Sequence, residues 1–363
     1  MKNINLIALN ADFEIISLLS YTNLQWNRKY HESGYFSVQI PLEQYRNDIC
    51  YVYTKDRPEM GKVGQINYRE KNGVRSVQIS GYFLEKQLDK YVVYPTGAGN
   101  IENAPAWIEQ SGAAEDVAIA FFDGFKTVVV DGVTANLDIT RSESQGRGNT
   151  AKHTRNGEKL GAKVYDILKP SGMSYRVSYD FLNSTQNFEV WGGLDRTDSQ
   201  YDNNPVTFST KFGNIKNPDV LLDESNYCTG AIVAREAQME SEQNYVRAVL
   251  EATDGDFRFT YVESVLRPDD YTTTDEFYSA LENEAHLEIL KRTKTVSVEF
   301  DALVGSYEYM TDFNLGDKCN VEIPEIGFYA DSRLIGCYEV IKNGAHALTL
   351  EFGTPIINNA RRK

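Results

Sequence analysis

Apolar and polar residues alternate along much of the N-terminal region, a pattern typical of strands that bury one face. The clearest runs are 24–27 and 35–41, with Gly34 between them. Two further runs, 64–70 and 74–81, flank the pair Asn72-Gly73. An Asn-Gly pair between alternating runs predicts a tight β-hairpin, because its turn needs positive φ at both central residues.

The same pattern returns near the C-terminus. Runs at 336–341 and 345–353 flank Asn343-Gly344, and a lysine precedes the Asn-Gly pair in both hairpins. A glycine also precedes each turn glycine, Gly64 by nine positions and Gly336 by eight.

A second similarity lies upstream of each hairpin. The sequence Ser-Val-Gln-Ile-Pro at 37–41 has a counterpart, Asn-Val-Glu-Ile-Pro, at 320–324. Each follows a glycine, Gly34 or Gly316. We predict a duplicated β-module. Two unrelated β-domains are the alternative.

Helical periodicity appears between and inside these β-rich regions. It predicts helices at 105–122, 158–168 and 274–291, the last with acidic residues at its start and basic residues at its end. Residues 95–103 have the composition of a loop, and strands are expected at 173–179 and 188–191. We therefore expect a first β-domain at 1–95, a mixed α/β region at 96–235, and a second β-domain at 236–363 that contains the helix 274–291.

The polar, glycine-bearing stretch 141–157 interrupts this organisation. It is our candidate for a mobile segment that contacts a partner or gates a channel. A solvated loop is the alternative, in which case its deletion leaves assembly intact.

Composition narrows the class of protein. The 363 residues include 37 Lys and Arg against 52 Asp and Glu, giving a net charge of −15. This acidity argues against a protein that grips nucleic acid or an anionic membrane surface. No apolar run reaches the 18 or so residues of a membrane span, and the N-terminus lacks a signal-peptide pattern, so we expect no stable membrane insertion. Free thiols are expected at four positions: Cys50, Cys228, Cys319 and Cys337.

Few residues point to chemistry. The four histidines, His31, His153, His286 and His346, form no metal or catalytic motif. Asp195, Asp198 and Asp202 lie close together in sequence, where a solvated turn is favoured over a calcium loop. The sequon at Asn183 is interpreted as a hairpin turn. We predict no catalytic, cofactor-binding or metal-binding residues and no cofactor.

Two alternatives stay open at this point. Abundant carboxylates leave room for paired-acid glycosidase chemistry. The 23 tyrosines suit strands, and they indicate either a carbohydrate-stacking platform or packing and oligomer contacts, of which the second is favoured.

Four segments resemble the tail-tip hub proteins of siphophages, which are related to baseplate hubs and to the N-terminal part of tail-associated lysins. They are 24–36 with Ile40-Pro41, 79–84 with Leu88, 188–197 with 206–209 and 212–215, and Tyr309 with 312–317. The segments are short and span nearly the whole chain.

This resemblance implies a β-rich α+β fold with two small β-barrel hub domains and mixed α/β insertions. It also implies a homotrimer. Three chains with two similar barrels each present six barrels to a sixfold tail tube. Family members often carry a peptidase, lysozyme or fibre domain after the hub, whereas here only residues 354–363 follow the last predicted strand. We therefore expect no cell-wall hydrolase activity.

The sequence thus predicts a non-enzymatic virion protein of the tail tip, assembled in the bacterial cytoplasm. Expected partners are a distal tail protein or tube ring, the tape measure protein, and a fibre, spike or lysin. DNA is expected as passing cargo, which an acidic lumen would leave unbound. The alternative is a carbohydrate- or receptor-binding module.

Overall fold

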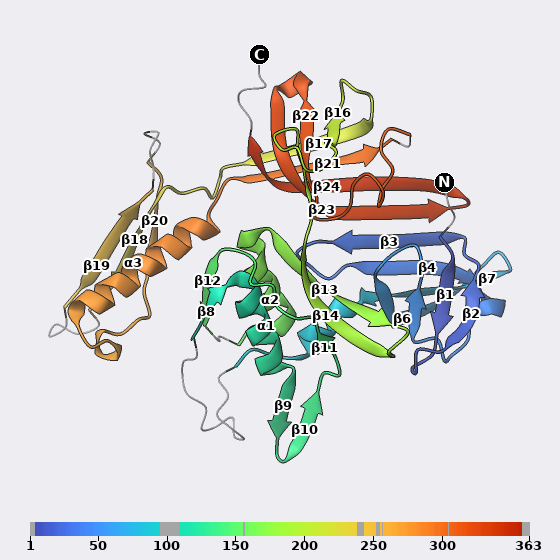
Figure 1. Cartoon of the computed structure of the whole chain (residues 1–363), viewed down its shortest axis with the longest axis horizontal. Coiled ribbons are helices and arrows are strands. Elements are labelled where there is room, and N and C mark those ends of the chain that lie inside the picture. Colours follow the sequence, from blue (N-terminus) through green and yellow to red (C-terminus); the bar gives the residue numbers. More distant parts are fainter. Residues whose placement is uncertain are drawn as a thin grey trace. The chain divides into compact units, whose positions relative to one another are not determined.

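The computed structural model describes residues 4–94, 109–154, 157–237, 243–251, 255, 257–303 and 305–357. Two compact units can be distinguished, a larger one of residues 1–219 and 299–363 and a smaller one of residues 220–298. The smaller unit is an insertion. The chain enters it along β17 (Ile215–Asp223) and leaves it along the neighbouring β21 (Thr295–Ala302). Figure 1 shows the course of the chain.

Seven strands at the N-terminus form one end of the main sheet, in the order β3-β4-β7-β6-β5-β1-β2. Strands from both ends of this order contribute to one core, so the sheet curls around it. Trp26 lies at its centre, with its ring 4.8 Å from Phe83 and 5.9 Å from Phe36. The strands are β1 (Leu6–Leu9), β2 (Ile15–Leu19), β3 (Asn23–Lys29), β4 (Tyr35–Pro41), β5 (Tyr51–Tyr53), β6 (Met60–Lys71) and β7 (Val74–Phe83).

The C-terminal strands form a second curved layer. They are β21, β22 (Lys318–Ile323), β23 (Phe328–Lys342) and β24 (Ala345–Ile357), and β15 (Asp195–Arg196) and β16 (Thr207–Ser209) pair with β22 in parallel. Four phenylalanine rings fill its core. Phe208 lies 5.1–5.6 Å from the rings of Phe300, Phe313 and Phe352.

Both predicted hairpins are confirmed. β6 and β7 are joined by Asn72-Gly73 and β23 and β24 by Asn343-Gly344, and all four turn residues have positive φ. Each hairpin also has a β-bulge in its first arm. The bulged residue, Gly64 or Ile335, lies nine positions before the turn glycine in both hairpins. The repeat seen in the sequence is therefore also a repeat of backbone geometry.

The neighbours of the two hairpins differ. β4, which contains 37–41, pairs with the second arm β7, whereas β22, which contains 320–323, pairs with the first arm β23. β23 also pairs with β3, from Gly336 opposite Lys29 to Lys342 opposite Asn23. This pairing joins both groups of strands into one 14-stranded sheet.

The middle of the chain forms a smaller α/β layer. The helices α1 (Ala114–Phe125) and α2 (Leu160–Leu168) lie beside β11 (Thr140–Arg141), β13 (Met173–Asp180) and β14 (Thr185–Gly192). Their shared core includes Phe122, stacked on Phe188 at 4.3 Å, and also Leu84 and Leu88 from the N-terminal region.

The prediction of a helix at 105–122 was wrong at its start. Residues Glu109–Ala113 form β8, which pairs with β12 (Thr150–Thr154), and the helix begins only at Ala114. Gly112 has φ +152°, a conformation that a helix does not allow. Part of the apolar stripe, Trp107 and Ile108, and the predicted loop 95–103 lie outside the described residues. A further hairpin, β9 (Thr127–Val130) and β10 (Val133–Asn136), follows α1.

The smaller unit is a three-stranded sheet covered on one face by a helix. β18 (Gly230–Arg235) lies between β19 (Tyr245–Leu250) and β20 (Phe259–Glu263). The helix α3 (Thr274–Lys291) has the predicted bounds, and the predicted face of Phe277, Leu281, Ala285 and Ile289 is buried. A capping box of Thr273 and Glu276 fixes its start.

The β-rich α+β fold class is confirmed. The expected boundary at 235/236 lies between the paired strands β18 and β19, and 95/96 lies outside the described residues. The three-domain division stays a prediction. All four cysteines are free, as expected. Within the described part of the chain, no helix is both long and apolar enough to cross a membrane.

Candidate functional site

The functional candidates gather where β3, β23 and the segment 305–317 meet, a region we call the seam. Arg28, on β3, is buried there. Its Nε donates to Glu59 Oε1 at 2.6 Å, and its Nη1 donates to Tyr309 Oη at 2.5 Å and Asn314 Oδ1 at 2.9 Å. Burial alone would lower the pKa of Arg28, because it disfavours the charged form. The nearby Glu59 and Tyr309 have the larger effect, and the pKa of Arg28 is raised. The seam therefore holds one permanent buried cation.

Three titratable groups near Arg28, Cys337, Tyr309 and Glu85, stay neutral near pH 7. Burial raises the pKa of the Cys337 thiol to about 12 and that of Tyr309 well above its ordinary value. Burial also raises the pKa of Glu85, with Glu59 adding to it, to about 8. These three protonated groups thus add no further charge beside the pair of Arg28 and Glu59.

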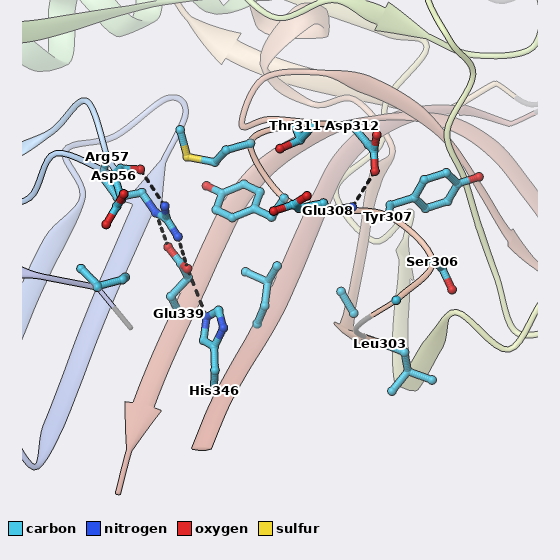
Figure 2. A pocket seen from close by; sticks show the side chains of 16 residues that line it. Asp56, Arg57, Leu303, Ser306, Tyr307, Glu308, Thr311, Asp312, Glu339 and His346 are labelled. Carbon is cyan, nitrogen blue, oxygen red and sulfur yellow. Dashed lines mark hydrogen bonds and ion pairs between the residues drawn. The ribbon is translucent and has the colours of Figure 1, made fainter. Parts of the chain in front are cut away.

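A cavity of about 580 Å³ opens beside the seam (Figure 2). On one side, Glu339 Oε2 accepts from Arg57 Nε at 2.7 Å. Its Oε1 accepts from Arg57 Nη2 at 2.5 Å and contacts His346 Nε2 at 3.1 Å. On the other side lies the loop that begins after β21, where Asp312 Oδ2 accepts from the backbone N–H of Glu308 at 2.7 Å.

At this cavity the charges of Glu339 and Arg57 satisfy each other. Burial alone would raise the pKa of Glu339, but its hydrogen bonds to His346 and Arg57 prevail and lower it. Both oxygens of this carboxylate are engaged, so it is poorly placed to act as a general acid or nucleophile. The arrangement suits a joint between β23 and the residues that follow β5.

Tyr30 links three of the segments that carry the resemblance. Its hydroxyl donates to the carbonyl of Gly172 at 2.9 Å and accepts from the N–H of Gly193 at 3.3 Å. A Cβ on Gly316, whose φ is +87°, would lie 2.5 Å from the Tyr30 ring. A Cβ on Gly193 would lie 2.0 Å from the backbone of Gly316. These glycines are needed because backbone and ring approach so closely.

Asp317 ties the third and fourth segments together. Its carboxylate accepts from Leu194 N at 2.8 Å, Arg196 Nε at 2.8 Å and Asn314 N at 2.9 Å. The first and second segments meet where Gly34 abuts the Phe83 ring and Tyr35 pairs with Tyr82 across β4 and β7. The four segments are therefore sites of close packing in the fold.

The histidines have separate environments. His31 is half-buried, and desolvation together with Lys169 and Arg333 lowers its pKa to about 3, which keeps it neutral. His286 Nδ1 lies 2.7 Å from Glu251 Oε1 on the smaller unit. His153 lies on β12, and only His346 reaches the cavity.

Asp195 forms an ordinary turn. Its Oδ1 accepts from the N–H and the hydroxyl of Thr197 at 2.9 and 2.7 Å. Within the described ranges, no group of three or more His, Cys, Asp or Glu side chains is placed to hold a metal ion. Asn183 lies in the turn between β13 and β14, as predicted.

Sequence analysis missed Arg28, Arg57, Glu59, Glu85 and Glu339. A signal existed for two of them. Arg28 shares strand phase with Leu24 and Trp26, as Glu339 does with Cys337 and Ile341. A charged residue in the apolar phase of a strand indicates a buried pair.

The polar stretch 141–157 is held by its own chain where the structure describes it. Arg147 forms an ion pair with Glu115 on α1 at 2.8 Å and donates to the carbonyl of Val190 at 2.7 Å. Ser144 donates to Asp116 at 2.5 Å. These contacts give the stretch order without a partner; its predicted role in partner contact or gating stays a prediction.

Several tyrosines are exposed on the N-terminal strands. Tyr35 and Tyr82 form a cross-strand pair, and Tyr68 lies farther along β6 with Ile66 nearby. These tyrosines are the most exposed aromatic residues of the N-terminal strands.

Sequence comparison identifies the family. Residues 6–354 match the family described as Siphovirus ReqiPepy6 Gp37-like protein. The chain belongs to this family. The predicted resemblance to siphophage tail proteins is thereby confirmed. Among curated proteins, no sequence matches it.

Two solved structures share the fold. A 43 kDa tail protein of prophage MuSo2 from Shewanella oneidensis has a TM-score of 0.61 and 11% identity, over 96% of this chain and 98% of that one. A tail protein from Neisseria meningitidis MC58 has a TM-score of 0.57 and 13% identity, over 97% of each chain. The chain thus belongs to a siphovirus protein family and shares its fold with phage tail proteins.

Proposed function

We propose that this tail protein is the hub of a siphophage tail tip, a non-enzymatic component that closes the tail tube and adapts its sixfold symmetry to a threefold tip. The observation that carries the proposal is the repeated hairpin. One chain contains two curved strand layers, each built on a hairpin with the same Asn-Gly turn and the same bulge position. Three chains would therefore offer six similar layers to a sixfold ring.

The seam supports a rigid arrangement of the two layers. The pairing of β3 with β23 joins the layers directly. The hydrogen bonds of Arg28 to Tyr309 and Asn314 and the ion pair of Arg57 with Glu339 also connect residues of the N-terminal and C-terminal parts. A symmetry adaptor needs such rigidity because its two layers must keep one spacing in every copy.

Electron microscopy of the assembled particle tests the proposal. We expect three copies around the tube axis at the tip, with the two layers of each copy alternating in a ring of six. Six copies in the ring, or copies only at the periphery, would contradict it.

The partners that we propose follow from a position at the tip of the tail. The hub would assemble in the host cytoplasm and contact a distal tail protein or tube ring, the tape measure protein, and a fibre, spike or lysin. The exposed tyrosines of β4, β6 and β7 are suited to such permanent contacts, since obligate interfaces favour aromatic residues.

The acidity of the chain suits a channel for DNA. A trimer would carry three times −15, and acidic walls repel phosphate. Residues 220–298 contain 16 acids and 7 bases, so −9 of the net charge belongs to the smaller unit. We expect acids to line the lumen of the assembled ring, and a basic lumen would refute this part of the proposal.

A receptor- or carbohydrate-binding module is the second candidate. The exposed pair of Tyr35 and Tyr82 favours it, because sugar rings stack on such surfaces. Binding of the isolated chain to host glycans, lost in Tyr82→Ala, would support this candidate, and light scattering would then show a monomer.

A further inference from the structure

The edges of the sheets differ in how they are protected. An exposed strand edge is a template for another strand, and proteins usually guard it with charges or proline. Among the described edge strands of four residues or more, six carry such a residue. They are β8 with Glu109, β12 with Lys152, β13 with Arg176, β17 with Pro218, β19 with Arg247 and β20 with Glu263. Three have no charge and no proline: β2, β9 and β10.

Every strand residue of the β9–β10 hairpin is exposed except Val128, which is half-buried. Its turn, Asp131-Gly132, has positive φ at both positions. The exposed fraction is 49% for Val130 and 70% for Val133, and Asp131 at the tip is its only charge. In Figure 1 it projects from the end of α1. A two-stranded hairpin without further packing is marginally stable in water, so this one is expected to gain a partner strand.

Strand β2 is the other unguarded edge of the larger unit. Its sequence is Ile-Ile-Ser-Leu-Leu, and it is the last strand of the main sheet, paired with β1. Ile15 is 68% exposed and Leu18 is 64% exposed. In Figure 1, β2 lies among the N-terminal strands, well separated from β9 and β10 in the same unit. The two edges of one chain therefore do not cover each other.

We propose that the β9–β10 hairpin of one copy pairs with the β2 edge of the next copy. The edges match in length, four and five residues, and both are uncharged. One repeated head-to-tail contact covers β2 and one edge of the hairpin in every copy, and such contacts form a ring when the rotation between copies closes. This inference rests on the proposed homotrimer and names the contact that would build it.

Charge substitution tests the pairing on the full chain. Val133→Lys and Leu18→Lys should each weaken self-association at least about tenfold by sedimentation equilibrium, since each buries a charge in an apolar interface. The double variant Val133→Lys with Leu18→Glu should recover most of the loss. Leu182→Lys, at a 95% exposed turn position, is the matched control and should change nothing. Equal unfolding temperatures would show that all variants fold.

Disulfide formation in purified tails identifies the chain that pairs with the β2 edge. In a Cys50→Ser background, the double variant Val133→Cys with Leu18→Cys should give covalent dimers and trimers of this chain under mild oxidation. Each single variant should stay monomeric on a denaturing gel. A Val133→Cys homodimer, a cross-link to another tail protein, or wild-type association in both lysine variants would overturn the pairing.

The outcomes separate the two proposals. A threefold ring at the tip that persists in the lysine variants refutes the pairing and leaves the hub function intact. Cross-linking between positions 133 and 18 in an assembly without a threefold ring supports the pairing and refutes the hub.

Discussion

The two Asn-Gly hairpins of the larger unit share a turn and a bulge but differ in burial. Along β23, alternate residues are buried, because β3 and β22 pair with it and β24 lies on its other side. In the outer part of β6, residues 65–71 are all exposed, because β5 pairs only with its first three residues. Identical local geometry thus produced a core element in one place and a surface element in the other.

An ion pair in each hairpin shows the consequence of this difference in burial. Glu339, in the first arm of the buried hairpin, is 1% exposed and pairs with Arg57. Glu70, in the first arm of the exposed hairpin, lies 3.4 Å from Arg75, with both side chains about half exposed. The same type of ion pair should therefore have very different energetic value in the two hairpins.

The largest expected effect comes from Glu339→Gln. It leaves the Arg57 guanidinium without its carboxylate in a buried site, which should lower the free energy of unfolding by about 3 kcal/mol or more. Chemical denaturation monitored by tryptophan fluorescence measures this. Arg57→Met combined with Glu339→Gln should be less destabilised than the single variant; an equal or greater loss would show that the buried charge is not the cause.

The next effect concerns Glu85, which follows the exposed hairpin directly. Burial raises its pKa to about 8, while in the unfolded chain it ionises near 4.5. Between these pH values the unfolded chain releases a proton that the folded chain keeps, so this group makes the protein less stable as pH rises. Glu85→Gln removes the penalty. Its advantage over the wild type should grow from pH 5 to 8, to a few kcal/mol at most, and then level off.

Glu339 is the matched comparison for this pH dependence. Its folded pKa is lowered, so the stability it contributes is present above the unfolded value of 4.5 and is lost as pH falls below it. Unfolding curves at several pH values should show the two carboxylates acting in opposite directions. A Glu85→Gln advantage that does not change with pH would show that Glu85 is already ionised.

A smaller effect should be equal in both hairpins. Gly73 and Gly344 have φ of +77° and +79°, and a Cβ on either would meet nothing within 4 Å. Alanine at each position should therefore cost only backbone strain, about 1–2 kcal/mol. The unfolding temperatures of Gly73→Ala and Gly344→Ala should fall by the same amount. A clearly larger loss in the buried hairpin would show that the turn is coupled to the core.

The smallest effect is expected for Glu70→Gln. The exposed pair with Arg75 is screened by water, so the change in the free energy of unfolding should stay within about 1 kcal/mol. The same denaturation experiment measures it, and raising the salt concentration should reduce it further. A loss as large as that of Glu339→Gln would mean that β6 is covered in solution.

Local chemistry explains how much of the fold was predictable. Asn-Gly turns, strand alternation and the capped helix 274–291 depend on neighbouring residues, so these elements were predicted closely. The start of α1 was not, because β8 exists only through pairing with β12 about 40 residues away. Likewise, the different neighbours of β7 and β23 could not be inferred from two similar sequences.

The candidate site depended on long-range contacts. Arg28 and Tyr309 are 281 positions apart and Arg57 and Glu339 are 282 apart, and nothing in the residues between them specifies these pairs. The resemblance segments were recognised by sequence, but their meeting around Tyr30, Gly193 and Gly316 became visible only in three dimensions.

The sequence by itself determined the turns, the hairpins, the family and the acidity of this protein, because these follow from local conformational preference and composition. Only the tertiary structure decided which hairpin is buried, which charges pair at the seam, and which strand edges remain open. Those outcomes depend on the neighbours that a strand acquires when distant segments pack together, and burial is a property of the neighbours as much as of the strand.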